Sequence, residues 1–274
     1  MIAHTNPLLL KDIVAGIRLP ACPLVFIQLT RAIQEGDQPS SEVANTISMD
    51  PALTAHVLRV ANSAMYGHPR RIHSISEATL RLGCSEIYFI ATALKARDLF
   101  TTSLGKFGQT LWEHSLKTGV LARGLCRRRN GMLTDAFFTA GILHDLGKLI
   151  LQQVTPSYML LCEDGAVSGS ELVARETAAF GTHHAALGGE LLDHWGLPET
   201  LVKLVAEHHD PQPDPNTSRN NSHGLLAAAN EMAHTIESGA PLMERKTTMI
   251  TADANERHML IAEFQRQMQI LRAS

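Results

Sequence analysis

An adjacent histidine and aspartate, His144 and Asp145, interrupt the apolar run from residue 134 to residue 148, whose pattern predicts a helix. Burying such a pair is costly unless a partner satisfies both polar groups. A divalent cation is one such partner, because an imidazole nitrogen and a neighbouring carboxylate oxygen can both reach it. The pair alone is a weak indication, since a single buried histidine is more often structural than a ligand. The fold must therefore bring further polar groups to this pair.

Other histidines occupy the apolar faces of separate predicted helices. Each lies three or four residues from apolar side chains, the spacing that keeps side chains on one stripe of a helix. The inward-facing members are His114, His184 and His208, and His209 follows just before Pro211 stops its helix. His183 falls about 100° around the helix from His184, on a polar face, so we expect it to face solvent.

Chance is the alternative explanation for this pattern. The chain has 14 histidines, and some would lie on apolar faces in any arrangement, each bonded to a carbonyl or a water. For one histidine taken alone that explanation is favoured. For the set a shared site is favoured, because several desolvated imidazoles in one core would leave many polar groups in need of partners.

The order of these residues resembles the HD superfamily of metal-dependent phosphohydrolases: His114, then His144-Asp145 within His-Asp-Leu-Gly-Lys, then His184, then His208-His209. Residues 180 to 209 are similar to the HDOD domain, the HD-related output domain of bacterial signalling proteins. Further matches precede this core, at Leu19-Pro20 with Pro23, Asp50-Pro51, Val60 to Ala64 with Tyr66-Gly67, and Ile75 to Gly83.

The resemblance covers about residues 13–237 and implies an all-α fold. A multi-helix HD-like bundle at residues 109–237 would follow an N-terminal helical lobe at residues 13–100. Helix signals recur along the chain and strand signals are scarce, which agrees with this fold. Residues 238–274 would form a C-terminal amphipathic helical tail, and packing against the domain or against a partner chain stays open.

The resemblance also implies a metal pocket. Its members would be His114, His144, Asp145, His184, His208, His209 and Asn230. Active HD enzymes close the shell with an aspartate where this chain has Asn230, and an amide offers only a neutral oxygen. We therefore expect a divalent metal (Fe, Zn, Ni or Mn) that is held weakly, with partial occupancy. Lys148 is a candidate phosphate contact, although capping carbonyls or reaching solvent is the favoured role.

The expected function is regulatory. After His209 the chain lacks the Gly-Tyr-Pro loop of the HD-GYP cyclic-di-GMP phosphodiesterases, and many HDOD members have lost catalytic ligands. We expect a bacterial signal-transduction module that is not an enzyme and that acts on a signalling protein partner. Whether the chain forms a homodimer stays open. The alternative is a metal-dependent phosphohydrolase acting on a nucleotide or phosphate ester, because most HD ligands are retained.

Binding to nucleic acid is a third hypothesis, and the charge pattern argues against it. Residues 40–67 have helix-turn-helix proportions, but only Arg59 is basic there, against Glu42 and Asp50. Anchoring to phosphates requires several lysines or arginines. The formal charge of −3 gives no general attraction to nucleic acid or to anionic membranes. The basic run Arg127–Arg129 ends the His114 helix, where we expect a solvated C-terminus that complements the helix dipole.

The four cysteines are widely separated and form no Cys-x-x-Cys pair, which argues against a structural zinc site and against a disulfide framework. No stretch approaches the roughly 18 apolar residues of a membrane span. The first twenty residues lack the basic and then apolar order of a secretory signal. We expect a cytoplasmic protein.

Capping signals predict the limits of several helices. Asp50 followed by Pro51 predicts a helix that starts there and runs to Gly67. Ser74 and Glu77 form a capping box for a short helix.

The boundary between the two lobes is predicted at residues 101–108, as a crossover and not as a flexible linker. Residues 211–222 are rich in Pro, Asp, Asn and Ser, which predicts a loop, with a new helix starting at Ser222.

Overall fold

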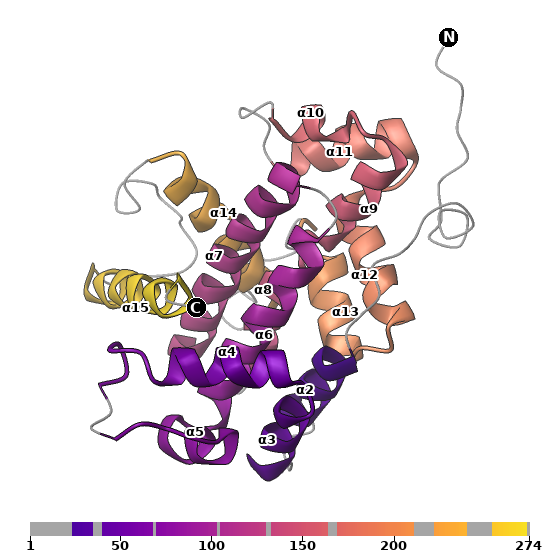
Figure 1. Ribbon diagram of the computed structural model, residues 1–274. Coiled ribbons are helices and arrows are strands. Elements are labelled where there is room, and N and C mark those ends of the chain that lie inside the picture. Colours follow the sequence, from indigo (N-terminus) through magenta and orange to yellow (C-terminus); the bar gives the residue numbers. More distant parts are fainter. Residues whose placement is uncertain are drawn as a thin grey trace.

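The computed structural model describes residues 24–34, 40–67, 70–102, 105–129, 133–163, 169–210, 222–239 and 254–272. Within these ranges every element of regular secondary structure is a helix, which confirms the predicted all-α class (Figure 1). The helices, in chain order, are α2 (Leu24–Gln34), α3 (Ser40–Ser48), α4 (Pro51–Ala61), α5 (Ile75–Leu82), α6 (Cys84–Thr101), α7 (Gly105–Arg129), α8 (Thr134–Leu143), α9 (Leu146–Val154), α10 (Tyr158–Glu163), α11 (Gly169–Phe180), α12 (His184–His194), α13 (Glu199–Ala206), α14 (Ser222–Glu237) and α15 (Ala254–Arg272). No helix in the described ranges is both long and apolar enough to cross a membrane.

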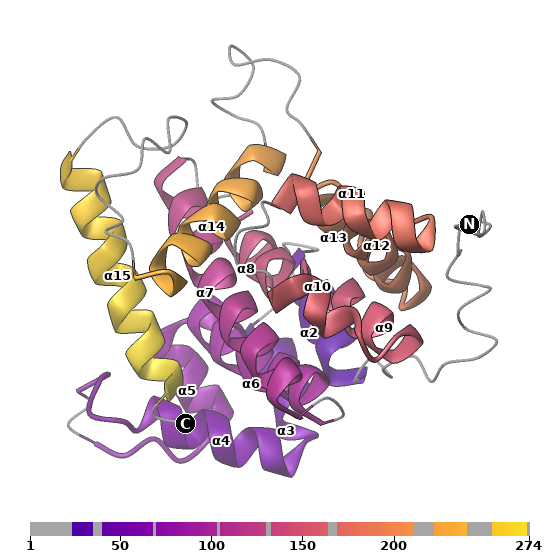
Figure 2. The same cartoon turned by 90° about the horizontal axis from the view of Figure 1, so that it is seen from above.

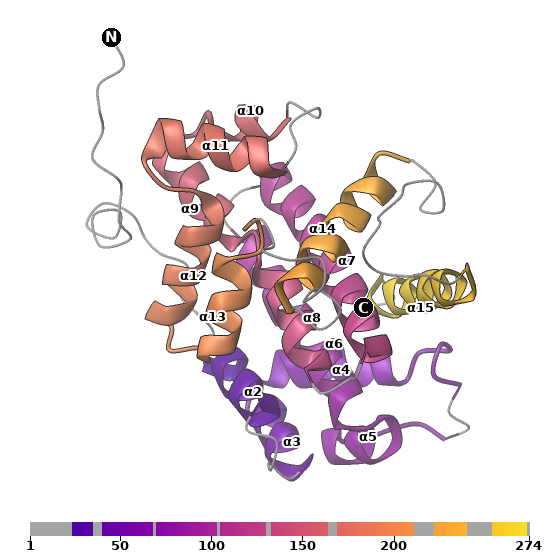
Figure 3. The ribbon, with the colours of Figure 1, turned by 180° about the vertical axis from the view of Figure 1, so that it is seen from behind.

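The helices are arranged around α7 and α8. Figures 1 and 3 show α9 to α13 on one side of this pair and α14 and α15 on the other, with α2 to α5 at one end. Helix α6 packs against both α7 and α8, so the N-terminal helices share the core of the later ones. Helix α6 ends at Thr101 and α7 begins at Gly105, which agrees with the predicted crossover.

Local capping explains the start of α4 and of α5. Asp50 accepts a hydrogen bond from the Leu53 N–H at 2.9 Å, and Pro51 is the first helical residue, as predicted. The helix ends at Ala61 and not at the expected Gly67. The reason is Asn62, whose side-chain amide makes hydrogen bonds to both backbone groups of Ile72, at 2.7 and 2.9 Å, and turns the chain.

The capping box of α5 is present in a shifted form. Ser74 Oγ accepts from the Glu77 N–H at 3.1 Å, and the Glu77 carboxylate accepts from the backbone N–H of His73 at 2.9 Å, one residue before the cap.

Helices α7 and α8 approach so closely that their backbones touch. A Cβ added at Gly141 of α8 would lie 2.6 Å from the Cα atom of Gly119 of α7. Only glycine permits this contact, because any side chain would push the helices apart. His114 lies before the contact on α7 and His144 follows it just after α8, so the glycines bring these two histidines near each other.

A second glycine contact joins α9 to α12. A Cβ added at Gly147 would lie 2.0 Å from the carbonyl oxygen of His184, the first residue of α12. The run from residue 134 to residue 148 is not one helix, because α8 ends at Leu143 and α9 begins at Leu146. The His144-Asp145 pair therefore lies in the break between two helices, directly beside the start of α12.

Helix α13 also ends earlier than the sequence predicted. Its last residue is Ala206, so His208 and His209 belong to the turn that follows and not to the helix. Residues 211–221, where a loop was predicted, lie outside the described residues, and α14 begins at the predicted Ser222.

The C-terminal helix α15 lies along α7 (Figure 2). The basic run at the end of α7 was expected to be solvated, which holds for the exposed Arg127 but not for Arg128, whose side chain is partly buried. Arg127 and Arg128 each make a 2.9 Å ion pair with Glu263 of α15. The tail therefore packs on this domain.

Candidate metal centre

The predicted pocket residues converge on one buried position between α7, the α8–α9 break, α12, the turn after α13, and α14. Asp145 lies at its centre. One carboxylate oxygen, Oδ2, is 3.3 Å from His144 Nε2 and 3.7 Å from His114 Nε2. The other oxygen, Oδ1, is 3.4 Å from His184 Nε2. All four side chains are buried.

The two histidines of the turn after α13 complete the cluster. His209 Nε2 is 3.1 Å from His184 Nε2, and the rings of His208 and His209 are 4.1 Å apart. The His208 ring is 4.9 Å from that of His144. His208 is buried and His209 is half-buried. The pocket thus brings together side chains that are far apart in the sequence.

Hydrogen bonds on the outer side of the imidazoles fix which nitrogen faces inward. His144 Nδ1 lies 2.8 Å from the Gly141 carbonyl, and His208 Nδ1 lies 2.7 Å from the Val205 carbonyl. A carbonyl can only accept, so Nδ1 carries the proton in both rings. Each Nε2 atom therefore presents a lone pair to the pocket, as in histidines that bind metals.

Three inward-facing atoms have no hydrogen-bond partner among the described residues. They are His144 Nε2, His208 Nε2 and Asp145 Oδ1, and all three are buried. Leaving such atoms unpaired costs about 1–3 kcal/mol each. A divalent cation accepts lone pairs from imidazole and carboxylate together, so the donor set fits a metal.

The ligand atoms fall into two groups of three, with the atoms of each group within 4.8 Å of one another. One group is His114, His144 and Asp145, and the other is His184, His208 and His209. Because Asp145 Oδ1 also approaches His184, the carboxylate faces both groups.

Glu176 of α11 supports the pocket, and the sequence analysis missed it. Its carboxylate accepts hydrogen bonds from His184 Nδ1 at 2.7 Å, from the His184 backbone N–H at 2.8 Å, and from the Tyr158 hydroxyl. Glu176 is fully buried between Leu172 and Phe180 on the inward face of α11. That spacing of four residues on each side places a carboxylate in an apolar stripe, and this signal was present in the sequence.

Helix α14 holds His114 from two sides. Asn230 Oδ1 lies 2.9 Å from His114 Nε2, and a carboxylate oxygen of Glu237 lies 3.0 Å from His114 Nδ1. The His234 ring stacks on His114 with centroids 4.3 Å apart, and Lys117 makes a 2.9 Å ion pair with Glu237. Asn230 was predicted from the sequence, whereas Glu237 and His234 were not.

The expectation for one flanking residue was wrong. Lys148 is buried and makes a 2.8 Å ion pair with Asp145, so it neither caps carbonyls nor reaches solvent. His183 is more exposed than the buried His184, as expected, although it is not part of a helix face. It is the N-cap residue of that helix, half-buried, and its ring nitrogen accepts from the Ala186 N–H at 3.4 Å.

Burial sets the protonation of the pocket at neutral pH. It lowers the pKa of His114 to about 4 and the pKa of His209 to about 2, and it holds the pKa of His208 well below its ordinary value. Burial alone would raise the pKa of Asp145, but the positive charge of Lys148 beside it holds that pKa well below its usual range. Neutral imidazoles and an ionised carboxylate are the forms that bind metals.

Comparisons with known proteins place these features in a family. A protein from Treponema pallidum is 28% identical over 195 residues, which are 70% of this chain and 38% of that protein. A ribonuclease Y from Petrotoga mobilis is 27% identical over 173 residues, which are 63% of this chain and 26% of that enzyme. This chain therefore spans well under half the length of these curated relatives.

A candidate phosphohydrolase from Shewanella amazonensis has the same fold. Its crystal structure gives a TM-score of 0.73 at 23% identity, over 96% of this chain and 97% of that chain. The family model described as the HDOD domain matches residues 19–211, which include both the predicted N-terminal motifs and the His-Asp pair. The chain belongs to the HDOD domain family.

Proposed function

We propose that this chain is a regulatory module of signal transduction whose HD-type pocket binds a divalent metal without efficient turnover. The proposal of metal binding rests on three buried atoms without hydrogen-bond partners, which belong to His144, His208 and Asp145. Their outer nitrogens are already held by backbone carbonyls, so the inward atoms are oriented before any ligand arrives. An imidazole-rich set of this kind suits Fe, Zn, Ni or Mn.

The charge of the pocket favours weak binding. Asp145 is the one carboxylate among the seven predicted ligands, and Lys148 already neutralises it through a 2.8 Å ion pair. Asn230 contributes a neutral oxygen at the position that closes the shell. A divalent cation would therefore meet little compensating negative charge, and its Lewis acidity would act on a substrate in few of the molecules.

The first test restores the missing charge. Asn230→Asp adds a carboxylate 2.9 Å from His114 Nε2, and we expect titration calorimetry with Mn²⁺ to give roughly tenfold tighter binding. Gln265→Glu adds the same charge at an exposed position of α15 and should leave the affinity unchanged. Equal Mn²⁺ affinity for Asn230→Asp and for the parent protein would contradict this explanation of weak binding.

A metal-dependent phosphohydrolase is the second candidate function. It is favoured by the two groups of ligand atoms, of which Asp145 belongs to one and approaches His184 of the other, and by the names of the Shewanella and Petrotoga relatives. A bound metal would polarise a phosphoryl oxygen and lower the pKa of water. The test is hydrolysis of bis(p-nitrophenyl) phosphate and of RNA with Mn²⁺. Activity that disappears in His144→Ala would promote this candidate over the regulatory one.

The partner and the location belong to the same proposal. A regulatory module acts through contact, so we propose a signalling protein as the partner, in the cytoplasm of a bacterium. Metal analysis of protein purified without chelators and without added metal separates a working pocket from a relic. A metal content at background level would argue against metal binding, and contact with the partner protein would then be the only proposed function.

A further inference from the structure

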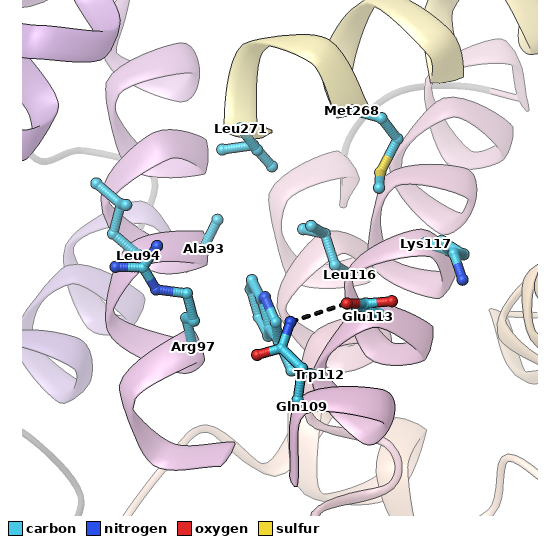
Figure 4. A pocket seen from close by; sticks show the side chains of 10 residues that line it. All are labelled: Ala93, Leu94, Arg97, Gln109, Trp112, Glu113, Leu116, Lys117, Met268 and Leu271. Atoms are coloured by element: carbon cyan, nitrogen blue, oxygen red, sulfur yellow. Dashed lines mark hydrogen bonds between the residues drawn. The ribbon is translucent and has the colours of Figure 1, made fainter. Parts of the chain in front are cut away.

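A cavity of about 380 Å³ lies between α6, α7 and α15 (Figure 4). We call it the Trp112 cavity. Its apolar walls include Trp112, Leu116, Met268 and Leu271, and two cationic side chains, Arg97 and Lys117, also line it. Figure 4 shows Trp112 between α6 and α7, with Met268 and Leu271 of α15 above it. None of the seven predicted metal ligands lines this cavity, and its volume is in the usual range for small-molecule pockets.

The charges that line the Trp112 cavity are unequally paired. Glu113 accepts a hydrogen bond from the Gln109 side chain at 2.8 Å, and Lys117 pairs with Glu237 at 2.9 Å. Arg97 is half-buried and makes no ion pair with any residue that the structure describes. A guanidinium group is a planar, permanently charged donor that matches a carboxylate or phosphate group. Glu113 is exposed to solvent, so the cavity combines the unpaired charge of the half-buried Arg97 with an aromatic face.

We propose that the Trp112 cavity is an effector site for a small organic oxyanion with a flat apolar body. Arg97 binds the charged oxygens, and the ring of the effector packs against Trp112. The apolar side chains of α15 close the cavity from the third side, so a bound effector also contacts the C-terminal helix.

The position of Lys117 links this cavity to the candidate metal centre. Its ammonium group binds Glu237, and the same carboxylate group binds His114 Nδ1 at 3.0 Å. An anion in the cavity competes for Lys117 and so changes how firmly Glu237 orients His114. Binding at one site then alters affinity at the other by an equal factor. This link rests on the proposed metal binding, whereas the effector site does not.

The effector site is tested with metal-free protein and the fluorescent sulfonate 8-anilinonaphthalene-1-sulfonate (ANS). The chain has two tryptophans, so Trp195→Phe leaves Trp112 as the only one. We expect saturable binding of one ANS per chain, with quenching of Trp112 emission. Arg97→Gln should weaken binding roughly tenfold or more, because it removes a charge-assisted hydrogen bond. Lys203→Gln removes an exposed cation of α13 and should change nothing.

Circular dichroism and thermal melting establish that each variant is folded, since ANS also binds unfolding protein. Non-saturable binding, or equal ANS affinity in the folded Arg97→Gln variant, would overturn the effector site. Met268→Phe gives an independent check, because the larger ring reduces the cavity and should weaken ANS binding.

The link is tested by Mn²⁺ titration with and without saturating ANS. We expect the Mn²⁺ dissociation constant to change severalfold, and Lys117→Met to remove that change. An identical Mn²⁺ dissociation constant with and without ANS would overturn the link. The proposal of an effector site would still be tested by ANS binding to metal-free protein. Absence of any Mn²⁺ binding overturns the proposed metal binding and the link together.

Discussion

Two buried polar clusters lie against α7, and they differ in how completely their members satisfy one another. The first surrounds Arg123, which is only 2% exposed. It donates hydrogen bonds at 3.1–3.3 Å to Ser85, Glu86 and Gln267, and it lies over the ring of Phe89 at 4.4 Å. Only its Nε–H lacks a hydrogen bond, and that atom is 3.7 Å from Asp135.

The second cluster is the candidate metal centre, where three ligand atoms have no partner in the described part of the chain. On the outer side of the cluster, the Nδ1 atoms of His144 and His208 bind backbone carbonyls and Asp145 pairs with Lys148. On the inner side, the three unpaired atoms face one another. Buried polar groups can thus satisfy one another, or they can leave atoms unpaired. The Arg123 cluster is nearly complete, with one N–H unpaired, and joins α6, α7 and α15, whereas the candidate centre leaves three donor atoms available to a ligand.

The largest expected effect is on stability, from breaking the Arg123 cluster. Arg123→Met should lower the free energy of unfolding by about 3–5 kcal/mol, because it leaves Glu86 and Asp135 without a cation. Arg127→Met, which removes a half-exposed partner of Glu263, should cost less than about 1 kcal/mol. Urea denaturation measures both variants. Similar losses in the two would remove the distinction between a structural cluster and a surface pair.

A lower pH should reduce the stability of the metal-free protein, because histidines of the candidate metal centre are held neutral in the folded chain. The pKa of His114 is about 4 and that of His209 about 2 in the folded chain, below the ordinary value of about 6.5. As the pH falls from about 6.5 toward 4, the unfolded chain therefore binds more protons than the folded chain. Each of these histidines then removes up to about 1.4 kcal/mol of stability per pH unit.

Urea denaturation at pH 7 and pH 5 checks this window. The variant His114→Asn with His209→Asn should show a shallower dependence on pH, whereas His73→Asn, at an exposed position, should keep the parent slope. A stability that is constant or higher at pH 5 would show that these imidazoles are not held neutral by burial.

A smaller effect is expected from loosening the support of one ligand. Glu176→Gln keeps the shape of the side chain but weakens its hold on His184 Nδ1, so Mn²⁺ affinity should fall roughly 10–100-fold. Glu171→Gln changes an exposed carboxylate on the same helix and serves as the matched control. Calorimetry that gives equal affinity for Glu176→Gln and the parent would assign Glu176 to folding alone.

The smallest expected effect is on signalling. His144→Ala with Asp145→Ala, combined with Lys148→Met so that no buried ammonium loses its partner, should keep the partner-dependent phenotype if circular dichroism finds the helices intact. Hydrolysis of cyclic-di-GMP should be undetectable in this variant and in the parent protein. A folded variant without the phenotype, beside Mn²⁺-dependent hydrolysis by the parent, would favour the phosphohydrolase.

Sequence reasoning succeeded where the deciding interactions are local. The Asp50 cap depends on contacts within three residues, and so does the cap at Ser74, so both are readable without the fold. The convergence of the histidines was also predictable, because each apolar face must turn toward one core. These features set the helical class and most of the candidate pocket.

The errors arose where a distant segment decides the outcome. Arg128 suits a solvated helix end until Glu263, more than 130 residues later, lies beside it. The apolar stripe of α11 indicates that Glu176 is buried, but its role depends on the start of α12, which presents two donors to it. The early end of α13 places His208 in the following turn, where the carbonyl of Val205 in α13 orients the ring, and periodicity carries no information on such a turn.

The glycine contact between α7 and α8 has a consequence for how this protein can change over evolution. Because Gly119 and Gly141 meet backbone to backbone, the spacing between the two helices does not depend on the size of any side chain at that point. Core residues elsewhere can be exchanged, and stability can drift, without moving His114 relative to His144. The spacing of His114 and His144 can therefore stay the same while core side chains change in the course of evolution.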